Sequence, residues 1–257
     1  MSKNGYHKKI PSNLAANLPE KFRFPKAEIE RKLFVEYGAL FVARGGAVAP
    51  ERLIFKNERE VLRFQKSVSI ARENIGGFTL ELQTAAMENL KMAIAEAEKN
   101  DLTITPRGAD AARRSYKDTI DLWASRVNPA LNYWMGEGKL SDEEAEKIRR
   151  LAPFEQVAEV FRLEDEDIFF SKDLQKPIMF SVAPPGASQH LSMLALDVSE
   201  FNDARVRGIL ARHFWFQTVV SDLPHFTFLG AAENELNGLG LKRVETEDGR
   251  VFWTPDV

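Results

Sequence analysis

Histidine, aspartate and glutamate are the side chains of this chain best suited to hold a metal ion, because the 257 residues include no cysteine. Without cysteine there is no thiolate nucleophile, no disulfide and no cysteine-ligated metal. Only four histidines are present. His7 lies in a polar, proline-punctuated N-terminal arm, and His213 ends the helical segment DARVRGILARH, where an imidazole favourably meets the carbonyl end of a helix. His190 and His225 remain as the candidates for chemistry.

The first candidate motif is the segment SQHLSMLALD, in which six residues separate His190 from Asp197. If MLALD is a strand, Met193, Ala195 and Asp197 share one face, while the alternate residues point into an apolar layer. A carboxylate on a half-buried strand needs a partner. The ordinary alternative is that Asp197 caps a loop or pairs with an arginine while His190 is a hydrogen-bonded core histidine. This spacing, taken alone, favours that alternative.

The second motif lies in FQTVVSDLPHFTFLG, where Asp222 precedes His225 by three residues and an alternating strand follows. Two imidazoles and one carboxylate form the ligand set that leaves a zinc ion with an open fourth position. A second carboxylate near one ligand is what such a site needs as a base and proton shuttle. The two motifs are therefore complementary, and together they supply the groups that a catalytic zinc site needs.

These motifs resemble those of the D-alanyl-D-alanine metallopeptidases of the VanY type, whose fold is shared with lysostaphin-type peptidases and the hedgehog signalling domain. That family shows S-x-H-x-x-G-x-A-x-D followed by E-x-x-H. The similarity extends over about residues 80–230. It implies one zinc ion per chain, held by the two histidines and the aspartate, with the acidic residue of the second motif as the base. The matching positions are Ser188, His190, Ala195, Asp197, Asp222 and His225.

Two positions depart from the family pattern. Met193 stands where the family usually has glycine, which bears on how closely the backbone can approach there. Asp222 stands where the base is usually glutamate, so the side chain is one methylene shorter. Aspartate serves as a general base where the backbone lies closer to the reacting groups. The resemblance therefore implies a variant active site.

Substrate recognition is expected to come from an arginine, because a guanidinium can bind a peptide's terminal carboxylate through two parallel hydrogen bonds. The family carries this arginine in an S-G-Y-R-S-x-x-x-Q segment. By position after the predicted strand LTIT the match is Arg107, and by letters it is Arg114 in RRSYKDT. We favour Arg107 and keep Arg114 as the alternative. Ser188 is a further candidate for a substrate hydrogen bond.

The elements that must position these residues change in character along the chain. Helical periodicity dominates the first two thirds, and short β-branched or aromatic runs separated by turns dominate the rest. This order predicts an α+β fold with helices packed on a small, mainly antiparallel sheet. Helices are predicted at residues 26–41, 57–71, 80–100, 109–127, 141–151, 154–167 and 203–215, and strands at 51–55, 102–105, 168–171, 178–183, 191–198, 216–221, 225–230 and 251–255.

No internal repeat or long linker interrupts this pattern, so the sequence predicts one domain from residue 26 to 257 after a flexible arm at 1–25. Within it we expect a helical extension at 26–79, a catalytic core at about 80–230 and a C-terminal hairpin at 240–255, turning at the EDG of residues 247–249.

Composition limits the partners. The chain has 35 basic and 38 acidic residues, interspersed along its length, and shows no basic stripe that would bind nucleic acid. No uncharged run approaches the length that spans a membrane. We expect a monomer. If its substrate is the bacterial cell wall, we expect export to the cell envelope from a precursor with a signal peptide; a cytoplasmic form acting on free dipeptides is the alternative.

The resemblance and the motifs together predict a hydrolase of peptidoglycan stem peptides, most simply a zinc-dependent D-alanyl-D-alanine carboxypeptidase. One alternative is an endopeptidase that cuts inside stem peptides or cross-bridges. The other is a catalytically inactive, zinc-stabilised module that binds the cell wall.

Overall fold

The computed structural model describes residues 11–257, so His7 and the first part of the expected arm lie outside the described residues. Contacts within the chain group the described residues into two compact units. The first comprises residues up to 53 together with 59–114 and 189–257, and the second comprises 54–58 and 115–188. The sequence predicts one domain over 26–257, whereas here residues 115–188 pack mainly among themselves. The predicted α+β class is confirmed, with helices and small antiparallel sheets.

The first unit begins with α1 (Ser12–Asn17), α2 (Glu28–Tyr37) and the 3-10 helix η1 (Gly38–Val42). Residues 12–17 are therefore helical where the sequence predicts a flexible arm. Helices α2 and η1 contact the C-terminal strand β7 (Val251–Pro255). Four aromatic rings also pack together, one from α2, one from η1 and two from the segment that precedes α2. The rings belong to Phe22, Phe24, Phe34 and Phe41.

A hairpin that the sequence reasoning missed follows α3 (Glu58–Ser67). Strands β1 (Ile70–Ile75) and β2 (Phe78–Gln83) pair antiparallel around Gly76 and Gly77, whose φ angles of 60° and 86° suit the type I′ turn that two consecutive glycines favour. The helix predicted at 57–71 therefore ends at Ser67. The helix predicted from residue 80 begins at Thr84, as α4 (Thr84–Glu98).

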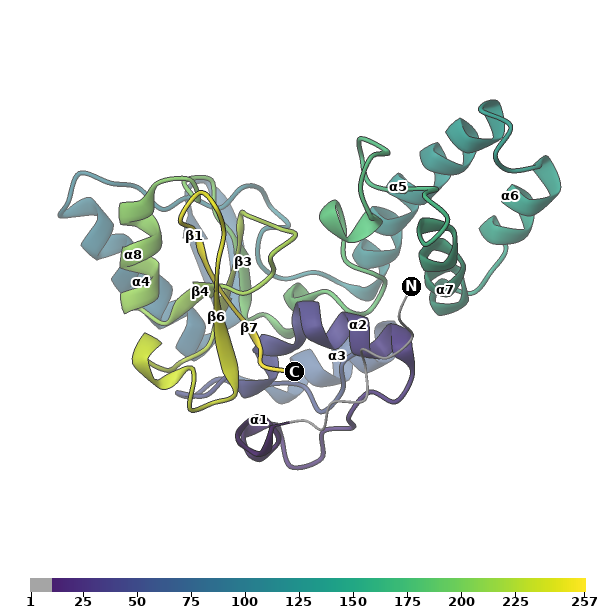
Figure 1. Cartoon of the computed structure of the whole chain (residues 1–257). Helices are drawn as coiled ribbons and strands as arrows, with labels where there is room; N and C mark the ends of the chain where they lie inside the picture. The colour runs from purple at the N-terminus through teal and green to yellow at the C-terminus, as the bar shows by residue number, and fades with distance from the viewer. Residues whose placement is uncertain (1–10) are drawn as a thin grey trace. The chain divides into compact units, whose positions relative to one another are not determined.

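The central sheet has the strand order β3–β5–β4 and is antiparallel throughout. It is formed by β3 (Ala195–Asp197), β4 (Trp215–Gln217) and β5 (His225–Phe228). One face packs against α4 and α8 (Ala204–Arg212), which lie side by side in Figure 1. That buried layer includes Leu194, Leu196, Trp215, Phe226 and Phe228 from the sheet region and Leu90, Ala93, Val206, Ile209 and Leu210 from the helices. The other face carries Asp197 and His225.

Residues 102–105 (LTIT) form no strand, and the chain from Thr105 to Arg107 runs beside the end of β3 without forming a continuous ladder. Pro106 bridges Val198, the N–H of Ser199 donates to the carbonyl of Thr105, and the N–H of Arg107 donates to the carbonyl of Asp197. These contacts deliver the chain after residue 105 to the end of β3. The C-terminal hairpin forms as predicted, from β6 (Leu241–Glu245) and β7, which pair antiparallel.

The second unit is helical. It contains α5 (Tyr116–Gly136), α6 (Asp142–Arg149), α7 (Pro153–Glu164) and the 3-10 helix η2 (Ile178–Phe180). Serine side chains cap α5 and α6: Ser115 accepts from the N–H of Asp118, and Ser141 from that of Glu144. The helix predicted at 109–127 therefore starts only at Tyr116.

Several strand predictions are wrong. Residues 168–171 and 178–183 have strand composition, but none of the described residues of the second unit is in a strand, so they have no ladder to join. Residues 51–55 form no strand either. Short apolar runs look alike whether or not a neighbouring strand is available. None of the described helices combines the length and the hydrophobicity needed to cross a membrane.

Candidate metal centre

The pairing of β3 with β5 sets Asp197 directly opposite His225, so both side chains lie on the same face of the sheet. His190 comes from the 3-10 helix η3 (Gln189–Ser192), which lies just before β3 and overlaps the start of the strand that the sequence predicts at 191–198. Both histidines are almost completely buried. The structure thus brings together the three residues that the sequence predicts as metal ligands, and in the described part of the chain they form a group able to hold a metal ion.

The three ligand atoms form a small triangle. His190 Nε2 lies 3.1 Å from His225 Nδ1, and each of these nitrogens lies 3.3 Å from Asp197 Oδ1. Ligands bound tetrahedrally to an ion at about 2.0 to 2.1 Å are separated from one another by about 3.3 Å. The triangle therefore has the size of one face of a tetrahedral metal site, with a fourth position left open.

Hydrogen bonds to the outer ring nitrogens fix which nitrogen of each histidine has a free lone pair. His190 Nδ1 lies 2.8 Å from the carbonyl oxygen of Ala112, which can only accept, so Nδ1 carries the proton. His225 Nε2 lies 3.0 Å from Gln189 Oε1. The Gln189 carboxamide is itself oriented, because its Nε2 donates to the carbonyl of Tyr37 at 2.9 Å and its Oε1 also accepts from Thr227 Oγ1. In the neutral form of each ring the inner nitrogen is therefore the unprotonated one, as a metal ligand requires.

Asp197 completes the arrangement. Its Oδ2 accepts from Arg114 Nη2 at 2.8 Å. Its Oδ1 is buried and has no hydrogen-bond donor among the described residues. An anionic oxygen and two nitrogen lone pairs thus meet at one buried point, where each repels the others unless a cation lies between them. The donor set and its geometry fit a metal ion.

The protonation states agree with this assignment. Burial, aided by the Arg114 guanidinium, lowers the pKa of His190 to about 4, so its ring is neutral at pH 7. The Arg114 guanidinium, whose Nη2 donates to Asp197 Oδ2, favours the ionised form of that carboxyl. Two neutral imidazoles and an ionised carboxylate are the forms that bind a cation.

Asp222, the predicted catalytic group, lies on the turn between β4 and β5. Its N–H donates to the carbonyl of Val219 at 3.1 Å, and its carbonyl accepts from the N–H of His225 at 3.2 Å. Although the residue is exposed overall, surrounding protein atoms partly desolvate its carboxyl and raise its pKa, with Asp197 adding to the rise. His225, Arg114 and Arg107 oppose the rise. These interactions put the Asp222 carboxyl within electrostatic range of His225 and Asp197, although Asp222 is not part of the metal-binding group.

The two candidate arginines have different surroundings. Arg114 is largely buried, and it is bound to Asp197. Arg107 is exposed, with its guanidinium 5.6 Å from the centre of the Phe201 ring. The backbone of Arg107 pairs with the Asp197 carbonyl, which fixes where its side chain begins. Arg114 therefore holds a ligand in place, whereas the Arg107 guanidinium is the one open to solvent.

The other predicted residues lie elsewhere. Ser188 is buried and belongs to the second unit, so its substrate hydrogen bond stays a prediction. His213 caps the end of α8 and pairs with Glu96, with 2.7 Å between Nε2 and Oε2, and is not part of the metal-binding group.

Met193 departs from the family's glycine at a position with special backbone geometry. Its φ angle is +59°, in the left-handed region that glycine adopts without strain. The side chain is completely buried. The glycine of the resembled motif thus corresponds here to a backbone requirement, which Met193 meets at a cost in strain.

Sequence reasoning missed the groups behind the ligands. The carbonyl of Ala112 and the Gln189 carboxamide set the two imidazoles, and Arg114 binds Asp197 rather than being free for substrate. Gln189 is adjacent to His190 in sequence but supports His225, which is 36 positions away. No local sequence pattern predicts a contact between residues so far apart.

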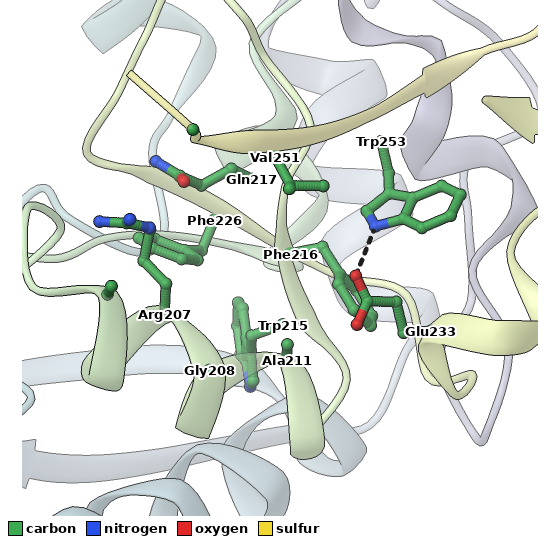
Figure 2. Close-up of a pocket in the computed structure, with 12 residues that line it drawn as sticks. Arg207, Gly208, Ala211, Trp215, Phe216, Gln217, Phe226, Glu233, Val251 and Trp253 are labelled. Carbon is green, nitrogen blue, oxygen red and sulfur yellow. Dashed lines mark hydrogen bonds between the residues drawn. The ribbon is translucent and has the colours of Figure 1, made fainter. Parts of the chain in front are cut away.

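A cavity of about 250 Å³ lies on the other side of the sheet, between α8, β4 and β7 (Figure 2). Phe226 lines it, and because neighbouring residues of a strand point to opposite faces, His225 points away from it. Arg207, Gln217, Glu233 and the rings of Trp215 and Trp253 also contribute to its walls. It is separate from the metal-binding group.

Comparisons with protein-family models, with curated proteins and with solved structures found no match to this chain. The functional assignment therefore depends on the residues themselves. A buried group of two histidines and one aspartate, sized and protonated to hold a metal ion, is the feature that carries it.

Proposed function

We propose that this chain is a zinc metallopeptidase of peptidoglycan stem peptides, acting as a D-alanyl-D-alanine carboxypeptidase of the VanY type. The observation that carries the proposal is the convergence of His190 Nε2, His225 Nδ1 and Asp197 Oδ1, each 3.1 to 3.3 Å from the others. The order of the motifs along the chain supports the peptidase class, and the donor set supports the metal.

Zinc suits the donors better than other common ions. Two imidazoles and one carboxylate in a tetrahedral arrangement are typical of catalytic zinc, whereas magnesium and calcium prefer oxygen ligands and higher coordination numbers. When bound, zinc would supply a Lewis acid for the scissile carbonyl and would lower the pKa of a water molecule toward neutrality.

Asp222 is the residue that we assign to proton transfer. Its raised pKa makes its carboxylate a better proton acceptor than an ordinary aspartate, and it lies within electrostatic range of His225. In the proposed reaction Asp222 accepts the proton of the attacking water and then donates it to the amine of the departing D-alanine. The new C–O bond forms first, and the scissile C–N bond breaks when the departing amine takes up that proton.

Arg107 is our choice for the terminal carboxylate of the substrate. Its guanidinium is exposed and lies over Phe201, while that of Arg114 is bound to Asp197. We assign Arg114 to holding Asp197. Because peptidoglycan lies outside the cytoplasmic membrane, the proposal also implies that the protein acts in the cell envelope.

The test combines metal content with turnover. Zinc is quantified by mass spectrometry in purified wild-type protein and in the His190→Ala, Asp222→Asn and His213→Ala variants, and D-alanine release from a stem pentapeptide is then assayed. We expect one zinc per chain in all but His190→Ala, and no release by His190→Ala or Asp222→Asn. His213→Ala is the matched control, because it removes an imidazole outside the metal-binding group.

The other outcomes point to different functions. Stoichiometric zinc with cleavage inside stem peptides, and without D-alanine release, would indicate an endopeptidase. Zinc and wall binding without any cleavage would indicate an inactive binding module. A protein that takes up no zinc would contradict the proposal.

A further inference from the structure

The turn of residues 218–224 joins β4 to β5 and carries Asp222, so its conformation sets where the Asp222 carboxyl points. Backbone hydrogen bonds to Val219 and His225 fix the main chain of Asp222. Side chains from outside the turn bind the residues on either side of Asp222: Gln217 donates to the carbonyl of Leu223, and Glu36 accepts from Ser221.

The contact with Glu36 is the long-range one. Glu36 Oε1 accepts two hydrogen bonds from Ser221, one from its N–H at 3.0 Å and one from Oγ at 2.7 Å. The two residues are 185 positions apart, so α2 alone brings the carboxylate to the turn. Two hydrogen bonds from one residue to the same acceptor fix that residue's orientation as well as its position.

The next residue of α2 reaches the second support of the site. The carbonyl of Tyr37 accepts from Gln189 Nε2 at 2.9 Å, and this bond turns Gln189 Oε1 toward His225. Consecutive residues of one helix thus contact the turn that carries the candidate base and the carboxamide that orients a metal ligand.

We propose that Glu36 is a positioning residue for proton transfer, holding Asp222 in its working orientation through Ser221; this inference rests on the proposed peptidase function. The N-terminal helix α2 is then part of the catalytic machinery, although it contributes no metal ligand and no group that touches substrate. Asp222 is shorter than the usual glutamate by one methylene, so its reach depends more strongly on where its backbone is held.

The test compares Glu36→Ala, Glu36→Gln and Ser221→Ala in zinc-loaded full-length protein. A glutamine at position 36 keeps an oxygen acceptor for both donors of Ser221, whereas alanine keeps none. For Glu36→Ala we expect kcat to fall about 10- to 100-fold with KM and zinc content unchanged, because the loss falls on a transition-state interaction. For Glu36→Gln we expect kcat within about threefold of wild type. Glu28→Ala, an exposed carboxylate in the first turn of α2, is the matched control and should match wild type.

A second measurement does not depend on turnover. Amide hydrogen exchange of residues 218–224 should be faster in Glu36→Ala than in wild type and close to wild type in Glu36→Gln. Adding Ser221→Ala to Glu36→Ala should cost little more, because both remove the same contact.

The failures are distinguishable. Wild-type kcat in Glu36→Ala with full zinc content would overturn the role of Glu36 and leave the peptidase intact. Equal losses in Glu36→Gln and Glu36→Ala would also overturn it, because charge and not the hydrogen bond would then matter. If wild-type protein releases no D-alanine, the peptidase proposal fails, and hydrogen exchange still shows whether Glu36 orders the turn.

Discussion

His190 Nε2 lies 3.1 Å from His225 Nδ1, and in the neutral rings both of these nitrogens are unprotonated, because the opposite nitrogen of each ring donates to an oxygen. Two lone pairs at this distance cannot form a hydrogen bond with each other. Asp197 Oδ1, 3.3 Å from both, adds a negative charge at the same point. The native fold thus holds three mutually repelling groups together, and a bound cation turns that repulsion into attraction.

Metal removal should therefore destabilise the protein. Metal at 100 times its dissociation constant stabilises the folded state by about 2.7 kcal/mol, which for a chain of this size corresponds to a melting temperature higher by about 5 to 10 °C. We expect a chelator to lower the melting temperature by that amount, measured by calorimetry. The His190→Ala variant should not respond to the chelator. An equal response in both would place the metal elsewhere.

Replacing Gln189 by leucine should weaken zinc binding about 10- to 100-fold, the usual effect of removing the group behind a metal-bound histidine. The leucine side chain fills similar space but cannot accept from His225 Nε2. Competition with a chromophoric chelator measures the affinity. Gln175→Leu, at an exposed position of the second unit, is the control. Unchanged affinity in Gln189→Leu would show that His225 needs no orienting partner.

Substitutions of Arg114 and Arg107 should affect different properties: stability and zinc binding for Arg114, and KM for Arg107. Arg114→Leu leaves a largely buried carboxylate without its partner, so we expect a loss of about 3 kcal/mol in unfolding free energy and weaker zinc binding. Arg107→Ala should leave both unchanged and should raise KM about 10- to 100-fold for peptides with a free C-terminal carboxylate, but not for amidated ones. Urea denaturation and steady-state kinetics test the pair. The reverse pattern would make Arg114 the substrate arginine.

At position 193 the glycine variant should be more stable than the alanine variant, which reverses the order usual inside a helix. Its φ angle of +59° costs alanine about 1 kcal/mol relative to glycine, so Met193→Gly should be more stable than Met193→Ala by about that amount. Both should be less stable than wild type, because each removes a buried side chain. At Met87, inside α4, alanine should be the more stable substitution. Urea denaturation of the four variants gives the comparison.

Tyr37 should make stability sensitive to alkaline pH. Burial, with smaller contributions from Glu36 and Asp222, raises its pKa well above the ordinary value of 10.0. Above pH 10 the unfolded chain then loses a proton that the folded protein keeps, so the free energy of unfolding falls as pH rises. Tyr37→Phe should make that fall shallower, by up to about 1.4 kcal/mol per pH unit. Identical slopes in both proteins, from urea denaturation between pH 9.5 and 11.5, would contradict this.

Local patterns in the sequence were enough to predict the residues of the metal-binding group and several helices and strands. With no cysteine and four histidines, two motifs and the family pattern that they resemble selected His190, Asp197 and His225 as partners, and the structure brings these three together. The α+β class and the hairpin turning at residues 247–249 also follow from the sequence, because periodicity and turn residues are local properties.

The tertiary structure decided what depends on distant neighbours. The strand-like runs at 168–171 and 178–183 have no neighbouring strand to pair with, and residues 115–188 pack mainly among themselves. The contacts of Gln189 with His225, Arg114 with Asp197 and Glu36 with Ser221 join residues 36, 83 and 185 positions apart. A hydrogen bond between distant residues leaves no periodic trace in either segment, so the residues that set the site's geometry become visible only once the chain is folded.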